Sequence, residues 1–349
     1  MKTSKVDGVL KTLFLSLLVV GLGAGVLRGV QMQNQSNQQS AVLTNVQQAP
    51  NLQPQQQLPP ALCNKVYLTG GHLNLNSDND VWSLNTTTNA WTQINANAPW
   101  SGRTYHTSVY FNNKLWVLGG INLVSGVSTN DVWSSPDGIT WTQVTANAPW
   151  SARSRHTSVV FNNKIFVMGG VDTSGPRNDV WSSSDGITWT QVTASASWSA
   201  RAGLESVVFQ NKIFILGGNN ANHDVWSSPD GLNWTQVTAN APWSGRGSFG
   251  AVIFKNIIWV MGGTGGQNHD VWYSPNGVNW TQVTPAASWG PRFQFPAVVF
   301  NNKMWLMGGI NLSNFGDVWS SQDGNNWTQV TSLAPWGPRN GMVAVVCTP

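Results

Sequence analysis

The chain has 349 residues, only 9% of them charged, and it contains 35 glycines, 21 tryptophans and 17 prolines. This composition disfavours long amphipathic helices with charged outer faces and suits short strands joined by tight turns. The net charge is +4, but the residues before 30 hold four of the 18 basic and one of the 14 acidic residues, which leaves 14 and 13 for the rest, so a nucleic-acid-binding surface is not expected.

Residues 1–30 have the pattern of an export signal. Lys2, Lys5 and Lys11 precede the apolar run 13–27, and Arg28 closes it. A basic segment before such a run is typical of a signal peptide, and the run is close to the length of a membrane anchor. Because basic flanks stay in the cytoplasm, the pattern predicts an exported chain, at the cell surface or in the periplasm. Cleavage of the segment is left open.

Residues 31–62 are rich in glutamine, asparagine, serine and proline and contain no apolar pattern that could build a core. Such a composition predicts a disordered tether between the leader and the folded part.

Residues 63–349 consist of a repeated unit of about 45 residues, each opened by an arginine. The unit that starts at Arg153 has four strand signals: the apolar stretch 157–161, a second apolar run at 164–168 followed by a glycine pair, DVWSS at 179–183 and WTQVT at 189–193. Asn-Asn and Asp-Gly pairs supply tight turns between the strands. Units of this length with four strands are the signature of propeller blades.

The two ends of this region are incomplete units that complement each other. The fragment 63–100 has strands two to four, and the fragment 337–349 has only a first strand. Together they predict a sixth blade that closes the ring and removes exposed edges. Aligned on the intact units, Cys63 and Cys347 occupy the two sides of the missing hairpin turn. In an exported protein this arrangement predicts a Cys63–Cys347 disulfide, with two buried thiols as the alternative.

The glycine pair, the DVW triplet and the later tryptophan recur with fixed spacing in every unit from 63 to 348. Together they resemble the kelch motif, in the bacterial form similar to the central domain of galactose oxidase. The resemblance implies an all-β, six-bladed β-propeller of kelch type, with the first strand of each blade innermost. Most tryptophans occupy repeated columns, so we expect them to pack one blade against the next.

The six opening arginines are the first candidate ligand-binding residues. In peptide-binding kelch propellers, arginines in this part of the repeat line the channel entrance, so the resemblance implies a ring of guanidiniums that could bind a carboxylate or sulfate. The alternative is pairing with the six aspartates of the DVW triplets, which should lie on the same face. The arginines are Arg103, Arg153, Arg201, Arg246, Arg292 and Arg339. The aspartates are Asp80, Asp131, Asp179, Asp224, Asp270 and Asp317.

Little in the repeat region suggests chemistry. No cluster of histidine, cysteine and acidic residues has metal-ligand spacing, and no catalytic triad is evident, so neither a metal nor a cofactor is expected. Glu205 is the weak catalytic candidate: it is the chain's one glutamate, and it replaces a threonine of the first strand. It could act as a general base, or it could pair with a neighbouring arginine. The other charges outside repeated columns are Asp78, Arg155, Asp172, Arg177 and Lys255.

Length variation is confined to the loops between the glycine pair and the DVW triplet, which should share one face of the propeller. We therefore expect a monomeric, exported or membrane-tethered, non-enzymatic binding module that presents this loop face to a glycan or protein partner. One alternative is a sugar mutarotase or epimerase that uses Glu205, by resemblance to sialic-acid mutarotases. The other is a structural or adhesion component without a discrete ligand. We expect the protein to contact the membrane only through its N-terminal segment.

Overall fold

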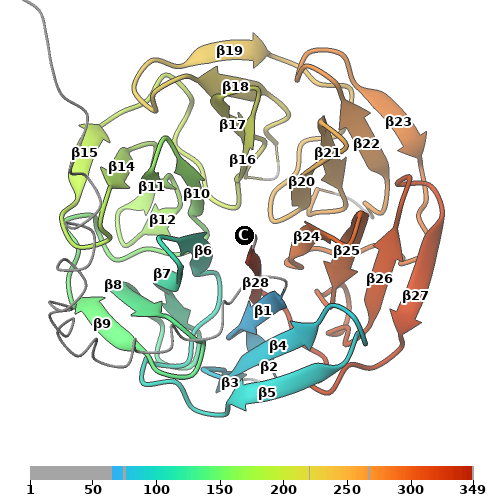
Figure 1. Ribbon diagram of the computed structural model, residues 1–349. Helices are drawn as coiled ribbons and strands as arrows, with labels where there is room; N and C mark the ends of the chain where they lie inside the picture. The colour runs from blue at the N-terminus through green and yellow to red at the C-terminus, as the bar shows by residue number, and fades with distance from the viewer. Residues whose placement is uncertain (1–64, 74–75, 220, 266–267, 348–349) are drawn as a thin grey trace, which may run out of the picture. The chain divides into compact units, whose positions relative to one another are not determined.

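Six four-stranded antiparallel sheets surround a central axis in the computed structural model of the chain (Figure 1). The structure describes residues 65–73, 76–219, 221–265 and 268–347. The predicted leader, the predicted tether and Cys63 lie outside the described residues. In the described ranges no helix is long and apolar enough to cross a membrane.

Each blade runs from an innermost first strand at the channel to an outermost fourth strand. Blade 1 consists of β28 (Val343–Cys347), β1 (Lys65–Thr69), β4 (Val81–Asn85) and β5 (Trp91–Asn95). Blade 2 consists of β6 (Thr107–Phe111), β7 (Lys114–Asn122), β8 (Val127–Ser135) and β9 (Thr142–Thr145). Blade 3 consists of β10 (Thr157–Phe161), β11 (Lys164–Met168), β14 (Val180–Ser183) and β15 (Thr190–Thr193).

The other three blades repeat the order. Blade 4 consists of β16 (Glu205–Phe209), β17 (Lys212–Leu216), β18 (Val225–Ser228) and β19 (Thr235–Thr238). Blade 5 consists of β20 (Gly250–Phe254), β21 (Ile257–Met261), β22 (Val271–Ser274) and β23 (Thr281–Thr284). Blade 6 consists of β24 (Ala297–Phe300), β25 (Lys303–Met307), β26 (Val318–Ser321) and β27 (Trp327–Thr331). Two small loop ribbons pair β2 (His72–Leu73) with β3 (Asn76–Ser77) and β12 (Val171–Asp172) with β13 (Gly175–Pro176).

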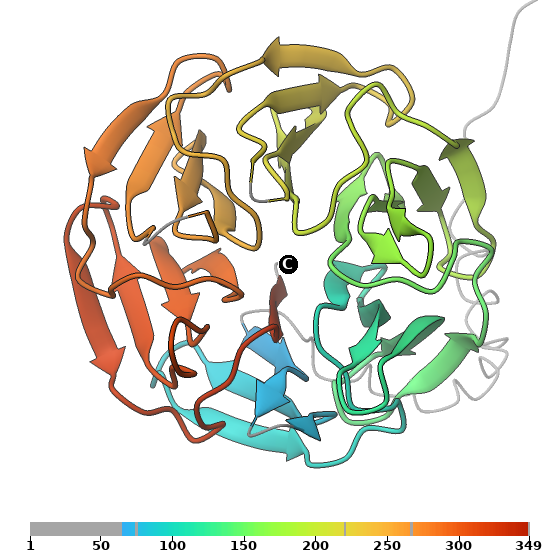
Figure 2. The ribbon, with the colours of Figure 1, turned by 180° about the vertical axis from the view of Figure 1, so that it is seen from behind.

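The two ends of the described chain meet in blade 1, as the fragment pattern predicted. Strand β28 pairs antiparallel with β1 along its whole length, from Lys65 opposite Cys347 to Thr69 opposite Val343. The two strands lie side by side at the channel in both views (Figures 1 and 2). Ring closure is therefore confirmed. The Cys63–Cys347 disulfide stays a prediction, because its first cysteine is outside the described residues.

The hairpin turns follow from their residues. Between the first two strands of blade 2, Asn112 and Asn113 both have positive φ, of 48° and 57°, which asparagine tolerates better than most side chains and which a two-residue turn of this hand requires. Between the last two strands, the Asp137 carboxylate accepts hydrogen bonds from the N–H groups of Ile139 and Thr140, at 2.8 and 2.7 Å. Gly138 donates to Ser135 Oγ at 2.7 Å.

Tryptophan pairs fill the spaces between blades. Trp198, which closes blade 3, is 0% exposed and packs edge-to-face on Trp234 of blade 4, with ring centroids 5.9 Å apart. The same T-shaped contact recurs at the other five junctions, at 5.7–6.1 Å. Each large ring buries apolar area that the thin blades cannot bury alone. The packing role predicted for these columns is therefore confirmed.

Candidate functional site

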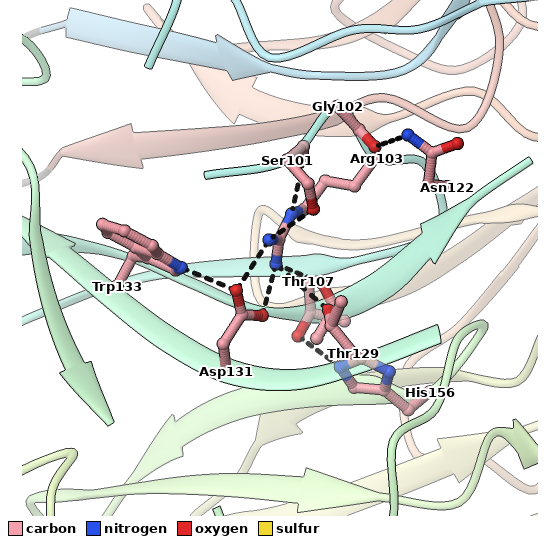
Figure 3. A network of polar contacts seen from close by, with 10 residues as sticks. Ser101, Gly102, Arg103, Thr107, Asn122, Thr129, Asp131, Trp133 and His156 are labelled. Carbon is pink, nitrogen blue, oxygen red and sulfur yellow. Dashed lines mark hydrogen bonds and ion pairs between the residues drawn. The ribbon is translucent and has the colours of Figure 1, made fainter. Parts of the chain in front are cut away.

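The opening arginines are buried in the wall of the propeller. Arg103 is 1% exposed, and its Nη1 and Nη2 donate to the two carboxylate oxygens of Asp131 at 2.7 and 2.8 Å (Figure 3). Its Nε donates to the carbonyl of Ser101, and Nη1 also donates to that of Gly119. Asp131 accepts a further bond from the indole N–H of Trp133. The guanidinium thus has acceptors for all of its donors within the protein.

All six arginines make this two-oxygen contact, and none is more than 2% exposed. The pairs are Arg103–Asp131, Arg153–Asp179, Arg201–Asp224, Arg246–Asp270, Arg292–Asp317 and Arg339–Asp80. A buried guanidinium is tolerated only when it is matched in charge and hydrogen bonding. The exposed ring of guanidiniums implied by the resemblance is therefore not what the structure shows. Of the two alternatives, the structure shows the pairing.

The pairing also fixes the charge of the aspartates. Burial alone would raise the pKa of Asp131, but hydrogen bonds and Coulomb attraction from Arg103 outweigh it and hold the pKa below its ordinary value. The same balance lowers the pKa of Asp179, Asp224 and Asp270. These ion pairs therefore stay charged at neutral pH and hold the loops to the blades.

Two residues after each opening arginine, the chain forms a closed ring of backbone hydrogen bonds around the channel. Each N–H of this set donates to the carbonyl of the corresponding residue in the preceding blade, at 2.7–2.9 Å. All six residues have left-handed φ angles of 51–64°. We call this set the mouth ring: Tyr105, Arg155, Gly203, Ser248, Gln294 and Gly341.

The mouth ring lies at the loop face. Thr104, Ser154 and Phe293, each next to a ring residue, form β-bridges with Ile121, Val171 and Ile310 at the start of the variable loops. A cavity of about 290 Å³, here the channel cavity, is lined by the ring and by the first strands of all six blades. A second cavity of about 370 Å³ is lined by four ring residues and by loop residues, so the ring lies where the channel meets the loop face.

Arg155 is a mouth-ring residue with an uncompensated charge. Its side chain is exposed, its guanidinium carbon lies 4.6 Å from the centre of the Tyr105 ring, and in the described part of the chain it forms no ion pair. Burial raises the pKa of Tyr105 in spite of the nearby Arg155, so the phenol stays neutral. A cation beside an aromatic ring at a channel mouth can receive an anionic group of a ligand.

Glu205 begins β16 and lines the channel cavity. Burial raises the pKa of its carboxyl to about 8. Among the described residues it has no hydrogen-bond or ion-pair partner, and Arg201 of the same blade is engaged by Asp224. The alternative that Glu205 pairs with a neighbouring arginine is not seen among the described residues: Arg201 pairs with Asp224, and Arg155 forms no ion pair with Glu205.

Two histidines also line the channel cavity. His106 Nε2 lies 2.9 Å from Thr69 Oγ1, and His156 Nε2 lies 3.0 Å from Thr107 Oγ1. Burial, with the nearby arginines, lowers the pKa of His106 well below its ordinary value and that of His156 to about 3, so both rings are neutral. The described ranges contain no group of three residues arranged to hold a metal ion.

The mouth ring was not found from the sequence. Its column holds six residues of five different types, and only the two glycines indicate left-handed backbone. Arg155 was identified as a charge outside the repeated columns, but no role was assigned to it. Its position in the repeat could have indicated a role. Arg155 lies two residues after a repeated arginine, in a column where the fold requires a left-handed backbone but does not restrict the side chain.

Comparison with known proteins agrees with this architecture. The chain matches the KLHDC2/KLHL20/DRC7 Kelch-repeats domain over residues 60–263. Residues 228–339 match the DUF6242 beta propeller domain. No curated protein matches the chain.

Proposed function

The chain belongs to the Kelch-repeat family, whose propellers are common binding modules, and from this premise we propose an exported or membrane-tethered binding module whose ligand enters the mouth ring from the loop face. The observation that carries the proposal is Arg155, an exposed guanidinium without an ion pair in the described part of the chain, set beside Tyr105 and Gln294 at the channel mouth. Every opening arginine, by contrast, is used inside the scaffold.

A glycan with an acidic group is the ligand that this mouth favours. The channel cavity, at about 290 Å³, is at the small end for ligand pockets, so it suits one sugar residue or another small group. Hydroxyl, imidazole and amide groups line one part of it and can hydrogen-bond sugar hydroxyls. Arg155 would bind the acid, and Tyr105 offers an aromatic face for the sugar ring.

The test is binding of the full chain to an array that contains matched acidic and neutral glycans. Arg155→Gln should weaken binding of acidic glycans at least about tenfold, because a charge-assisted contact is lost. Arg177→Gln, which alters a surface arginine paired with Asp172, is the matched control and should bind normally. Equal binding by Arg155→Gln and the unmodified chain would contradict the proposal.

A protein partner is the second candidate, and the loop tips favour it. Val124 and Leu312, in the loops of blades 2 and 6, are apolar and 66% and 99% exposed. A Val124→Ser, Leu312→Ser double variant should weaken a protein partner while leaving glycan binding unchanged. If the double variant loses glycan binding but still binds the protein partner, the loops belong to the sugar site instead.

Glu205 supports the enzymatic alternative. A carboxyl whose pKa is about 8 is well placed to move a proton on a bound sugar near neutral pH. The measurement is the rate of anomer interconversion, followed by exchange NMR with the unmodified chain and with Glu205→Gln. Rates that are equal for both proteins, and equal to the uncatalysed rate, would remove this alternative.

The cellular location in this proposal rests on residues 1–30 and needs its own test. A reporter that is active only outside the cytoplasm, fused after Pro349, should be active with residues 1–30 present and inactive without them. Activity without these residues would refute the export assignment.

A further inference from the structure

We infer that the channel cavity binds a small zwitterion, with the ligand's carboxylate on Arg155 and its ammonium group on Glu205. The inference deepens the proposed function, since it uses the same mouth, and it names the chemistry of the group that enters. It follows from a guanidinium and a carboxyl that both lack an ion-pair partner among the described residues, from their spacing and from an uneven cavity wall.

Glu205 differs from every other carboxylate in the described ranges. The six DVW aspartates pair with arginines, and Asp172 pairs with Arg177. The other aspartates accept hydrogen bonds, as Asp78 does from the N–H of Asn79. A carboxylate away from bulk water without such a partner is costly. The half-buried Glu205 carboxyl therefore keeps its proton near neutral pH, and a bound cationic group would supply the partner that lets it ionise.

The spacing of Arg155 and Glu205 suits a short bifunctional molecule. The Arg155 carbonyl accepts the N–H of Gly203 at 2.8 Å, and Glu205 follows Gly203 by two residues. Two residues of chain span at most about 7 Å, so the backbones of Gly203, which contacts Arg155, and of Glu205 lie within about this distance of each other. The two side chains form no ion pair with each other. A ligand with opposite charges at its two ends can bridge them.

The channel cavity has a polar wall and an apolar wall. In the two positions of each first strand that line it, blades 2, 3 and 4 contribute threonine, serine and glutamate. Blades 5, 6 and 1 contribute glycine, alanine, proline and valine at the same positions. The hydroxyl of Ser158 has no hydrogen-bond partner among the described residues. The polar wall can satisfy the charged ends of a ligand, and the apolar wall can cover its hydrocarbon body.

Titration gives the inference a distinctive readout. The other titratable groups that line the channel cavity are Tyr105, His106, Arg155 and His156, and the lining residues of β20, β24 and β28 carry none. Neither histidine nor Tyr105 changes its charge between pH 6 and 8, because the histidine pKa values are lowered and the Tyr105 pKa is raised. Without ligand, Glu205 is mostly protonated at pH 7. Binding of an ammonium group should therefore release about one proton.

The experiment is calorimetry of the full chain with 4-aminobutanoate, 5-aminopentanoate and 6-aminohexanoate. Each acid is matched by its N-acetyl derivative, which lacks the ammonium group, and by its amide, which lacks the carboxylate. At least one of the three should bind, and either modification should weaken it about tenfold or more. Affinity should rise about tenfold per pH unit from pH 6 to 7.5, and the heat should depend on the ionisation enthalpy of the buffer.

Two variants separate the two contacts. Glu205→Gln should bind the amino acid and its N-acetyl derivative equally, and should lose the pH dependence. Arg155→Gln should bind the acid and its amide equally, while Arg177→Gln should match the unmodified chain. Native tryptophan fluorescence of each variant shows that it is folded.

Absence of binding by all three amino acids, or equal affinity of the unmodified chain for an amine and its N-acetyl form, would overturn the inference. If Arg155→Gln still abolishes binding of acidic glycans in that case, the proposed function stands without the zwitterion. If the chain binds a zwitterion but no glycan on the array, the glycan assignment is overturned and the inference is supported.

Discussion

Replacing Glu205 with glutamine should stabilise the propeller, and increasingly so as the pH rises. The carboxyl pKa is raised from 4.5 to about 8 by burial. Between these values the folded protein holds a proton that the unfolded chain has released. The contribution of Glu205 to stability is therefore fully present below about pH 4.5, falls as the pH rises, and is gone above pH 8. Glutamine has nearly the same shape and does not titrate, so the stability of the variant should not fall with pH in this way.

The size of the effect follows from the same window. One bound proton corresponds to a change of about 1.4 kcal/mol per pH unit in the free energy of unfolding. Between pH 4.5 and pH 7 the unfolding free energy of the unmodified chain should fall relative to that of Glu205→Gln by roughly 2–3 kcal/mol. The value is set somewhat below 1.4 kcal/mol per pH unit because water that reaches the channel cavity lessens the effect of burial. In a domain of this size, such a difference raises the melting temperature by roughly 3–5 °C.

The assay is denaturant unfolding of both proteins, followed by tryptophan fluorescence, in steps from pH 4.5 to 8.5. The matched control is Asp185→Asn in an exposed turn. Burial alone would raise the pKa of Asp185, but the N–H groups of Thr188 and Ile187 donate to its carboxylate and lower it. Because the lowered pKa of Asp185 lies below this pH range, the control should be less stable than the unmodified chain by an amount that stays nearly constant from pH 4.5 to 8.5. A difference between the unmodified chain and Glu205→Gln that is constant over the whole pH range would refute the argument.

Three further predictions address the scaffold. Arg201→Met, which leaves the partly buried carboxylate of Asp224 without its cation, should lower the unfolding free energy by about 2–4 kcal/mol in denaturant titrations. Gly341→Ala should lower the melting temperature more than Gly203→Ala does, because a Cβ would meet Thr104 Oγ1 at 2.0 Å at the first site but its nearest atom at 3.0 Å at the second. If the predicted disulfide forms, the denatured, unreduced chain should show no free thiol to alkylation mass spectrometry, and Cys347→Ser should melt lower by an amount worth about 2–5 kcal/mol.

Ring closure could be read from the sequence because a repeat supplies its own reference. Aligning the first and last fragments on intact units placed Cys347 and Cys63 on the two sides of the missing hairpin turn. The structure pairs Cys347 with Lys65, two residues after Cys63 in the chain. Strand register is fixed by alternation of side chains and by two-residue turns, and both are local properties of the sequence.

The fate of the arginines could not be read in the same way. The sequence placed the arginine and aspartate columns on one face, but whether a guanidinium points into the channel or into the wall depends on packing between distant segments. Arg103 and Asp131 are 28 residues apart, and Arg339 reaches Asp80 across the closure of the ring. The mouth ring was hidden for a related reason. Its hydrogen bonds join residues one blade apart, and side-chain type does not reveal them.

Comparison of the six blades with one another separates what the fold needs from what it leaves free. The buried arginine, its aspartate and the tryptophan pair recur in every blade, so they are explained by closing a ring. A residue without counterparts has no such explanation. Arg155 occupies a position that the other five blades fill with uncharged residues, and Glu205 a position held elsewhere by threonine, glycine, proline or valine. Both break the repeat in adjacent blades, both line the channel cavity, and neither has an ion-pair partner among the described residues. Since four blades fold without either charge, and each charge is absent from five, their presence together points to a ligand that carries the complementary pair.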